Sequence, residues 1–440
     1  MPRRPLRSVP TLISAAQRGI TPGARRYAMV MLAIVYMFNF IDRQILAILL
    51  PAIRDEFQVG DTILGLLAGT AFALFYVTLG IPIAQLADRF NRRNLIALAV
   101  AVWSGMTALS GFAANIWQLT LARVGVGIGE AGCSPPAHSM IADLYPPERR
   151  SSAMGFYTLG ISAGIMLAYL AGGWVADNIG WREAFFVVGI PGLLLAVLVR
   201  FTVQEPQRGA SEQRADSGQR PSLLVVMRFL LARRSFLYMA VGAGISSFVG
   251  YAVVNFLPSF IVRSFGMNVA LLGLWLGLIY GISGGFGFFM GGYLADHIGR
   301  SGHRRALTFI ALAMLVSVVF SLGVFLAPSA FWCLIVFIVP AATSNFYLAP
   351  VLSQTQSLVS LRMRAVASSL VLLIINVIGL AMGPPLTGLL SDLLEPGLGA
   401  ESMRYSLLIV TCVLLPVAAW CYFEAGKSIE SDLQRADEHD

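Results

Sequence analysis

Four charged side chains interrupt stretches of the sequence that are otherwise apolar: Asp42, Arg43, Arg123 and Glu130. Charged groups are costly in apolar surroundings, so they usually pair with one another or face a polar cavity. Glu130 lies seven residues beyond Arg123, which places both side chains on one face of a helix. The residue types and spacing therefore predict one network in which two acids and two guanidiniums neutralise one another.

Two interpretations of this network differ in their chemistry. In the first, it is a structural clamp between two helices. In the second, the acids change partners, because a carboxylate that loses its arginine in a dry site takes up a proton more readily. Asp42 and Glu130 are then the proton-binding candidates, and Arg43 and Arg123 pair with them or hold an anionic headgroup. His138 is more typical of a satisfied residue at a helix end than of a proton relay.

The composition indicates the solvent around these charges. Of 440 residues, 57% are hydrophobic and 12% charged, whereas soluble domains average roughly 45–50% apolar and 25% charged residues. The formal charge of +8 does not indicate nucleic acid, because the basic residues form short clusters between apolar runs. We expect no metal and no cofactor, since the cysteines fit neither a metal site nor a disulfide framework and are predicted to be small buried hydrophobes: Cys133, Cys333, Cys412 and Cys421.

A helix that crosses a bilayer needs about 20 mainly apolar residues. The sequence contains twelve such runs, at residues 28–50, 62–86, 94–113, 116–142, 151–175, 184–201, 236–260, 270–294, 306–327, 330–357, 365–390 and 405–423. These runs predict an all-α membrane protein. One long polar interruption suggests a flexible linker and divides the chain into a basic N-terminal tail (1–26), a six-helix half (27–201), the linker (202–235), a second six-helix half (236–423) and a C-terminal tail (424–440).

Basic residues predict the orientation, because Lys and Arg are retained on the cytoplasmic side of membrane loops. With the N-terminus inside, the outer loops hold only four basic residues: Arg54, Arg182, Arg263 and Arg404. Both termini are therefore expected in the cytoplasm. The N-terminal tail is predicted to be a topology anchor rather than a signal peptide, since its apolar run is long and contains two charges. Heavy use of arginine with a single lysine, Lys427, favours a bacterial inner membrane.

Several motifs recur at similar offsets in the two halves. Asp88-Arg89-Phe90-Asn91-Arg92-Arg93 follows the second apolar run, and Asp296-His297-Ile298-Gly299-Arg300 follows the eighth. In the fifth run of each half, Gly173-x-x-x-Asp177 matches Gly388-x-x-x-Asp392, and these two runs begin with Arg150-x-x-Ala153 and Arg364-x-x-Ala367. Repeats near one offset indicate two structurally related halves.

These motifs resemble those of the major facilitator superfamily, whose signature appears here with Ala84 and Asn91 in two glycine positions. The resemblance spans essentially the whole chain and implies two pseudo-symmetric six-helix bundles and transport by rocker-switch alternating access. It also implies a cytoplasmic gate formed by Asp88, Arg89, Arg92, Arg93, Arg150, Asp296, Arg300 and Arg364. Because helix N-termini attract carboxylates, Asp88 is expected near residues 365–367 and Asp296 near residues 151–153.

A finer resemblance rests on Asn39-Phe40-Ile41-Asp42-Arg43-Gln44 combined with the glycine-rich segment 125–132. Together they look like the Spinster-like branch, which implies proton-linked movement of lysophospholipids and sphingoid phosphates. The second half offers neutral polar groups as the other cavity wall: Tyr251, Asn255, Asn345, Tyr347 and Asn376. A cavity charged on one wall and neutral on the other suits an amphiphile.

Two alternatives remain open: an organic-anion or drug carrier, and a sensor on a transporter scaffold that no longer transports. Two repeated gate motifs argue against the sensor. An enzyme is not expected, since Gly127-x-Gly129-x-x-Gly132 matches a dinucleotide fingerprint without the preceding strand that such a site needs. The expected partners are the bilayer, a small amphiphilic substrate and protons, with the chain as a monomer.

Overall fold

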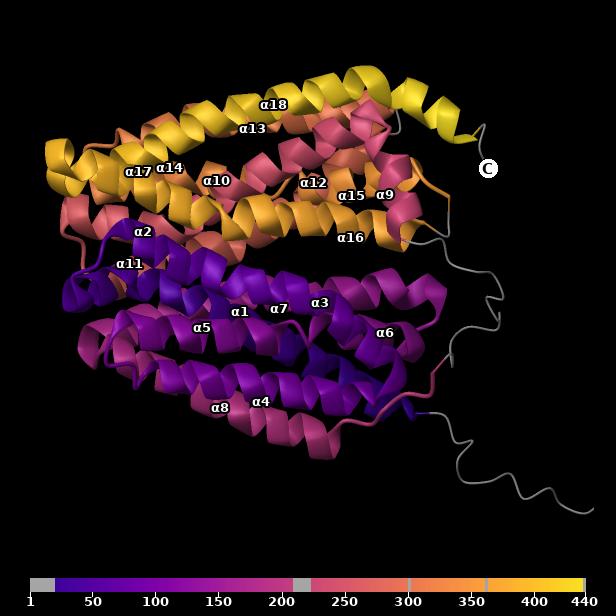
Figure 1. Ribbon diagram of the computed structural model, residues 1–440, viewed down its shortest axis with the longest axis horizontal. Helices are drawn as coiled ribbons and strands as arrows, with labels where there is room; N and C mark the ends of the chain where they lie inside the picture. The colour runs from indigo at the N-terminus through magenta and orange to yellow at the C-terminus, as the bar shows by residue number, and fades with distance from the viewer. Residues whose placement is uncertain (1–19, 209–222, 300–301, 361–362, 438–440) are drawn as a thin grey trace, which may run out of the picture.

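The computed structural model describes residues 20–208, 223–299, 302–360 and 363–437, and all regular structure in these ranges is helical (Figure 1). The N-terminal half comprises α1 (Pro22–Phe57), α2 (Asp61–Gly65) with η2 (Leu66–Thr70) and α3 (Ala71–Arg89), α4 (Arg92–Ser110), α5 (Ile116–Glu130) with α6 (Ser134–Leu144), α7 (Pro147–Asn178) and α8 (Trp181–Thr202).

The C-terminal half repeats this order after the short helix α9 (Leu223–Leu231). It comprises α10 (Arg234–Phe265), α11 (Val269–Leu278) with η3 (Ile279–Gly284) and α12 (Gly285–Gly299), α13 (His303–Phe325), α14 (Ala330–Thr343) with α15 (Leu348–Ser357), α16 (Arg364–Ile374) with η4 (Ile375–Ala381) and α17 (Gly383–Leu398), then η5 (Gly399–Glu401) and α18 (Ser402–Asp437).

Ten helical segments of the described chain are long and apolar enough to cross a membrane. One of them, Val366–Arg435, contains two crossings, because η5 separates α17 from α18. The pair α5 and α6 adds the remaining one. The twelve crossings expected from the apolar runs are thus present, six in each half.

Two crossings that the sequence predicted as continuous helices are broken. The run at 116–142 turns at residues 131–133 between α5 and α6, and the run at 330–357 turns at residues 344–347 between α14 and α15. Pro135 and Pro136 lie in the first turn of α6, where the missing N–H groups of proline are tolerated. An unbroken helix through them would lose backbone hydrogen bonds. The first break therefore falls directly after Glu130.

The linker and the C-terminal tail are more ordered than the sequence suggested. Within 202–235, residues 223–231 form α9, and α10 already begins at Arg234. α18 continues through most of the predicted tail to Asp437. Asp432 on this extension accepts hydrogen bonds from the backbone N–H and the hydroxyl of Ser235, at 2.9 and 2.7 Å. This buried carboxylate caps the N-terminus of α10 and fixes the extension against the C-terminal half.

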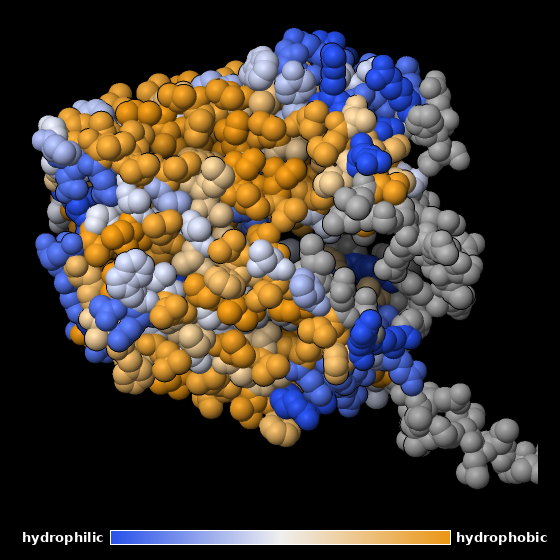
Figure 2. All heavy atoms as spheres, viewed as in Figure 1, coloured by the Kyte–Doolittle hydropathy of each residue, from blue (hydrophilic) through white to orange (hydrophobic). Residues whose placement is uncertain are grey.

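The outer surface carries many large apolar side chains, among them Trp117, Phe201 and Phe289. Figure 2 shows a broad hydrophobic band across the middle of the molecule, with hydrophilic residues gathered toward its two ends. A soluble protein rarely exposes so much contiguous apolar surface. The band is the lipid-facing surface of a membrane protein.

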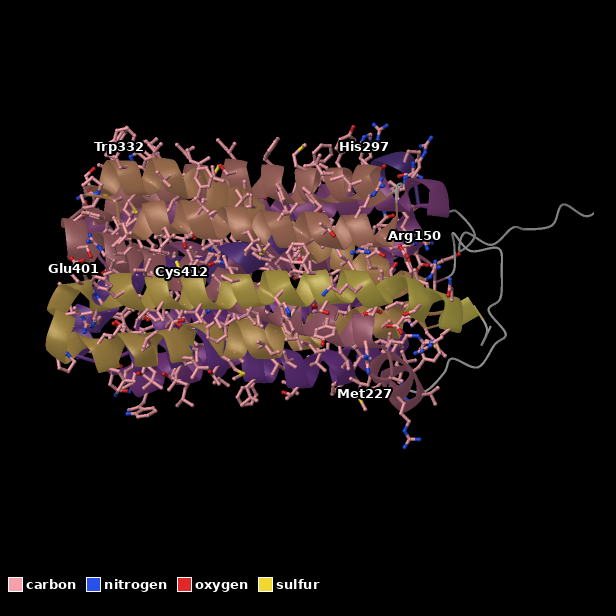
Figure 3. All side chains as sticks on the ribbon, turned by 90° about the horizontal axis from the view of Figure 1, so that it is seen from above. Arg150, Met227, His297, Trp332, Glu401 and Cys412 are labelled. Carbon is pink, nitrogen blue, oxygen red and sulfur yellow. The ribbon has the colours of Figure 1, made fainter. Side chains whose placement is uncertain are left out.

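The start of α1 and the end of α18 lie at the same end of the molecule, which we call the termini end (Figure 1). Arg150 and His297 lie there, whereas Glu401 and Trp332 lie at the opposite end, which we call the far end (Figure 3).

The space around four glycines shows that the two halves are in contact at the far end and separate toward the termini end. A Cβ added at Gly65 would come within 2.5 Å of the Pro384 carbonyl oxygen, and one at Gly173 within 2.8 Å of that of Val269. Gly80 and Gly155, further along the same crossings, have nothing within 4 Å of that position. The interface between the halves is therefore closed at the far end and open toward the termini end.

Candidate functional site

The predicted network of buried charges forms in the core of the N-terminal half. Arg43 on α1 donates from Nη2 and Nε to Glu130 Oε2 on α5, at 2.6 and 3.2 Å. Glu130 is fully buried, and the Arg43 side chain is 10% exposed. The two helices are thereby joined by a charge-assisted pair in a nearly dry site.

Asp42, the other acid, has no such partner. Its side chain is fully buried, and neither carboxylate oxygen makes a hydrogen bond to any residue that the structure describes. Trp103 and Thr107 on α4 lie beside it, and their Nε1 and Oγ1 atoms are also without partners. The mutual neutralisation of two acids and two guanidiniums that the sequence predicted is therefore only half realised.

Arg123 approaches Asp42 without pairing with its carboxylate. Its Nη1 donates to the backbone carbonyl oxygen of Asp42 at 3.1 Å, and its Nε has no partner within the described chain. The guanidinium lies 5.8 Å from the ring centre of Phe72, which also faces Arg43 at 4.7 Å. A cation over an aromatic face gains electrostatic stabilisation. The Phe72 ring therefore contributes to the stabilisation of both arginines.

A cavity of about 310 Å³ lies between the two halves and reaches into the C-terminal half. Phe40, whose ring lies 5.1 Å from the Arg43 guanidinium, lines it from the N-terminal half. Of the expected neutral wall, four residues line the cavity: Tyr251, Asn345, Tyr347 and Asn376. Asn255 does not, and its Nδ2 donates to the Tyr251 carbonyl oxygen one turn earlier in α10, at 2.8 Å. Such a cavity lies within the size range of small-molecule sites.

The far end is closed around Asp61, a further buried acid that sequence reasoning did not single out. Asp61, at the start of α2, is fully buried and accepts hydrogen bonds from both Nη atoms of Arg263 on α10. Ser391 on α17 donates to its Oδ2 at 2.7 Å, and Arg54 Nε lies 3.6 Å from its Oδ1. Arg54 also pairs with Glu395 at 2.6 Å. These contacts join the N-terminal half to three positions on α10 and α17.

Asp392 on α17 strengthens the same closure by binding the N-terminus of α2. Its carboxylate accepts from the backbone N–H groups of Asp61 and Thr62, at 2.7 and 2.8 Å, and from the Thr62 hydroxyl at 2.5 Å. A carboxylate there satisfies free N–H groups and meets the positive end of the helix dipole. One turn earlier, Gly388 allows the Asp61 backbone to approach α17, since an added Cβ would overlap the Asp61 carbonyl oxygen.

The matching motif, Gly173-x-x-x-Asp177, makes the equivalent contact on the other side of the molecule. Gly173 packs on the backbone of α11, and Asp177 Oδ2 accepts from Asn268 Nδ2 at 2.7 Å, at the N-cap of that helix. This bond is exposed and single, whereas Asp392 accepts three. The repeat was visible in the sequence as evidence of two related halves. Its role in closing the far end appears only when opposite helices are brought together.

The expected gate residues at the termini end are only partly described. Arg92 is buried and donates to Glu205 Oε1 and the Pro206 carbonyl oxygen, both at 2.8 Å, and the backbone N–H of Arg93 donates to Glu205 Oε2. Both arginines thus hold the segment after α8 against the N-terminal half. Of the other gate residues, Arg89 and Arg364 are exposed, and Arg150 Nη2 donates to the Ala142 carbonyl oxygen at 3.0 Å. The side chains of Asp88, Asp296 and Arg300 lie outside the described residues, so their expected contacts remain predictions.

His138 on α6 is exposed, and its ring contacts that of Tyr157 on α7 edge to face, with ring centres 5.5 Å apart. No hydrogen bond joins it to Glu130 among the described residues.

Comparison with known proteins gives these features a family. The family model described as Major Facilitator Superfamily matches residues 32–384. An MFS-type efflux pump of Mycolicibacterium smegmatis is 32% identical over 406 residues, covering 91% of this chain and 92% of that protein.

The Spinster branch is supported by a relative and by a solved structure. Protein spinster homolog 1 of Homo sapiens is 33% identical over 251 residues, which cover 56% of this chain and 47% of that protein. The crystal structure of a bacterial homologue of the human lysosomal transporter Spinster, in an inward-facing and unoccupied conformation, superposes with a TM-score of 0.86 at 31% identity. It covers 94% of this chain and 99% of that one. The chain therefore belongs to the major facilitator superfamily, in its Spinster-like branch.

Proposed function

We propose that this transporter is a proton-coupled secondary carrier of an amphiphilic, lipid-like solute of the lysophospholipid or sphingoid type. It works in a bacterial inner membrane by rocker-switch alternating access, with both termini in the cytoplasm. The termini end is then the cytoplasmic end, and the structure corresponds to an inward-facing state. The observation that carries the proposal is the pairing of a sealed acid–arginine network with a mainly apolar cavity beside it.

Arg43 supplies the chemical link between proton and substrate. Its planar guanidinium is engaged by Glu130 and lies over Phe40, which lines the cavity. A guanidinium binds a carboxylate or a phosphate with the same bidentate geometry. When a proton neutralises Glu130, Arg43 loses its anionic partner and is free to hold the anionic headgroup of a substrate. Proton binding and headgroup binding are thereby favoured together.

The remainder of the cavity suits the rest of an amphiphile. Its lining consists of apolar side chains and neutral polar groups such as Asn345 and Asn376, and Arg43 lies behind Phe40. Apolar surface that leaves water on binding contributes roughly 25 cal/mol per Å². A solute with one charged head and an apolar body is therefore matched at both of its ends.

A second candidate is an organic-anion or drug carrier. The relative in Mycolicibacterium smegmatis that aligns with most of this chain is named an efflux pump. An apolar cavity with few charges also accommodates hydrophobic drugs. The two candidates differ in which solutes the protein should accumulate when a proton gradient is imposed.

Reconstituted protein in liposomes with an imposed pH gradient tests both candidates. Lysophospholipids, sphingoid phosphates, small carboxylates and cationic drugs are compared as substrates, and Glu130→Gln is compared with Glu424→Gln, which alters an exposed pair with Lys427. We expect gradient-dependent accumulation of the lipids, lost in Glu130→Gln and kept in Glu424→Gln. Accumulation of carboxylates or drugs alone would favour the second candidate. Lipid transport that is independent of the pH gradient would overturn proton coupling.

A further inference from the structure

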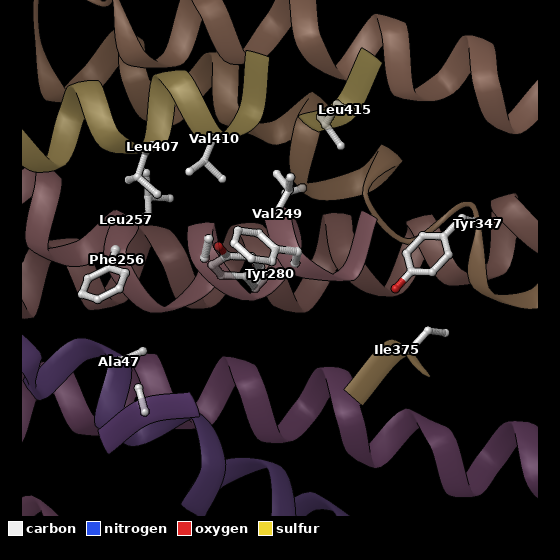
Figure 4. Packing of buried hydrophobic residues seen from close by; sticks show 14 of the residues in the cluster. Ala47, Val249, Phe256, Leu257, Tyr280, Tyr347, Ile375, Leu407, Val410 and Leu415 are labelled. Atoms are coloured by element: carbon white, nitrogen blue, oxygen red, sulfur yellow. The ribbon is translucent and has the colours of Figure 1, made fainter. Parts of the chain in front are cut away.

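The cavity does not end at the interface between the two halves. One part is lined from the N-terminal half by Tyr36, Phe40 and Ile161, but another is lined by Ser317 on α13 and Thr411 on α18, inside the C-terminal six-helix bundle. We call this second part, lined by Met314, Ser317, Ser321, Val324, Thr411 and Leu415, the inner chamber. Figure 4 shows Val249 on the side of α10 that faces α18, where Leu415 lies. The cavity therefore passes α10 from the interface into the core of one half.

Two glycines line this passage. Gly250 on α10 and Gly284 on η3 both border the cavity. A Cβ added at Gly250 would meet nothing within 4 Å, and one at Gly284 only the Asn345 amide nitrogen, at 3.8 Å. Glycines in the interior of a helix cost roughly 0.5–1 kcal/mol relative to alanine, and many in this chain are explained by close helix contacts. Gly250 makes no such contact, so we interpret the absence of a side chain there as keeping the cavity open at this point.

The inner chamber is lined by apolar side chains and by three side chains with hydroxyls, of which the hydroxyl of Thr411 is buried and unsatisfied. Thr411 is 1% exposed, and its Oγ1 has no hydrogen-bond partner among the described residues. By contrast, Ser246 on the opposite wall donates to the Gly242 carbonyl oxygen at 2.8 Å. Leaving a buried hydroxyl unpaired is costly, so such a group indicates a ligand or water that completes it. A chain that carries a hydroxyl group would satisfy Thr411 and fill the apolar remainder.

We propose that the inner chamber binds the apolar chain of the transported amphiphile, prefers a chain that bears a hydroxyl, and has its accepted chain length set by Gly250. This inference rests on the proposed function, because it assigns the part of the substrate that lies farthest from Arg43. The headgroup stays near Phe40, beside Arg43, and the chain runs past Gly250 and Gly284 toward Thr411. Short chains end before the passage, so they do not depend on it.

A side chain at Gly250 tests the passage. In Gly250→Val, binding and transport of long-chain lysophospholipids should fall roughly tenfold or more, since overpacking a formed site is strongly unfavourable. Short-chain analogues should keep wild-type values. Gly397→Val is the matched control, because Gly397 also has open space at its Cβ position but does not line the cavity. Binding of a fluorescent lysolipid to protein in nanodiscs is measured beside uptake, and size-exclusion profiles verify folding.

Thr411→Val tests the hydroxyl preference, since valine keeps the shape and removes the hydrogen bond. The ratio of affinities for hydroxylated and plain chains should fall roughly fivefold or more. An equal loss for short and long chains in Gly250→Val, or an unchanged chain-length profile, would overturn the chamber as the chain site. An unchanged ratio in Thr411→Val would overturn the hydroxyl preference. If wild-type protein moves no lysolipid at all, the proposed function fails instead. Binding of probes with chains from decanoyl to octadecanoyl then still tests whether the inner chamber is the chain-binding site.

Discussion

Asp61 and Asp42 are both fully buried aspartates, yet their surroundings are opposite. Asp61 is bound by Arg263, approached by Arg54 and hydrogen-bonded by Ser391. Asp42 has tryptophan and threonine donors nearby but no hydrogen bond and no direct arginine partner among the described residues. The first lies between the halves at the far end, and the second lies inside one half.

The difference separates two tasks that a buried acid can perform. A carboxylate saturated by cations stabilises the one conformation in which those cations surround it, because removing either partner leaves a buried charge. A carboxylate without a cation is costly while charged and is better accommodated as the neutral acid. We therefore interpret Asp61 as a clasp that closes the far end and Asp42 as a site that exchanges a proton.

The clasp should show the largest effect. Asp61→Asn removes the charge that Arg263 and Arg54 share, and breaking a buried ion pair in this way costs about 3–5 kcal/mol. The far-end-closed state should lose population. Spin labels at Trp117→Cys and Phe331→Cys, which are exposed at the starts of α5 and α14, should report longer distances across the far end in a variant without native cysteines. An unchanged distance distribution would show that the clasp does not hold this state.

The proton site should respond differently. Asp42→Asn removes no ion pair, so the protein should keep its thermal stability, whereas accumulation driven by a pH gradient should fall. A coupling of 1–3 kcal/mol corresponds to a loss of roughly 5- to 150-fold. Glu130→Gln should show the same loss of gradient dependence together with lower stability, because it leaves Arg43 without its partner. Should both variants accumulate substrate like wild type, the network returns to its interpretation as a structural clamp.

Replacing the arginines by lysine tests whether the network binds an anionic substrate. Arg43→Lys keeps the charge but loses the planar fork that engages Glu130 through two nitrogens. Apparent affinity for an anionic substrate should fall roughly fivefold to tenfold. Arg123→Lys should have a smaller effect, since Arg123 donates only to a backbone carbonyl oxygen. Wild-type affinity in both variants, measured by uptake across substrate concentrations, would limit both arginines to a structural role.

The smallest effect is expected on the other side of the far end. Asp177→Asn alters one exposed hydrogen bond to Asn268, which is worth at most about 1 kcal/mol. The same pair of spin labels should report little change, in contrast to Asp392→Asn, which weakens three bonds to the start of α2. A larger change from Asp177→Asn than from Asp392→Asn would reverse our ranking of the two contacts.

The sequence alone was sufficient for the membrane crossings and for the charges within them. In lipid every backbone N–H and C=O must be satisfied within the segment, so a long apolar run is committed to a helix. It also revealed the two related halves, through motifs such as Gly173-x-x-x-Asp177 and Gly388-x-x-x-Asp392. It did not reveal the break after Glu130, although the prolines that favour it were visible.

Pairing was decided only by the tertiary structure. Arg43 and Glu130 are 87 residues apart, and Arg263 and Asp61 are 202 apart, so no local pattern joins them. Asp42 was predicted to be neutralised in a network of two acids and two guanidiniums, and the packing of α1 against α4 and α5 left its carboxylate without a hydrogen bond from either described arginine. The inner chamber likewise arises where α13 and α18 meet beyond Gly250 of α10. Helix formation is satisfied by neighbours along the chain, whereas the partner of a side chain depends on which distant helix packs against it.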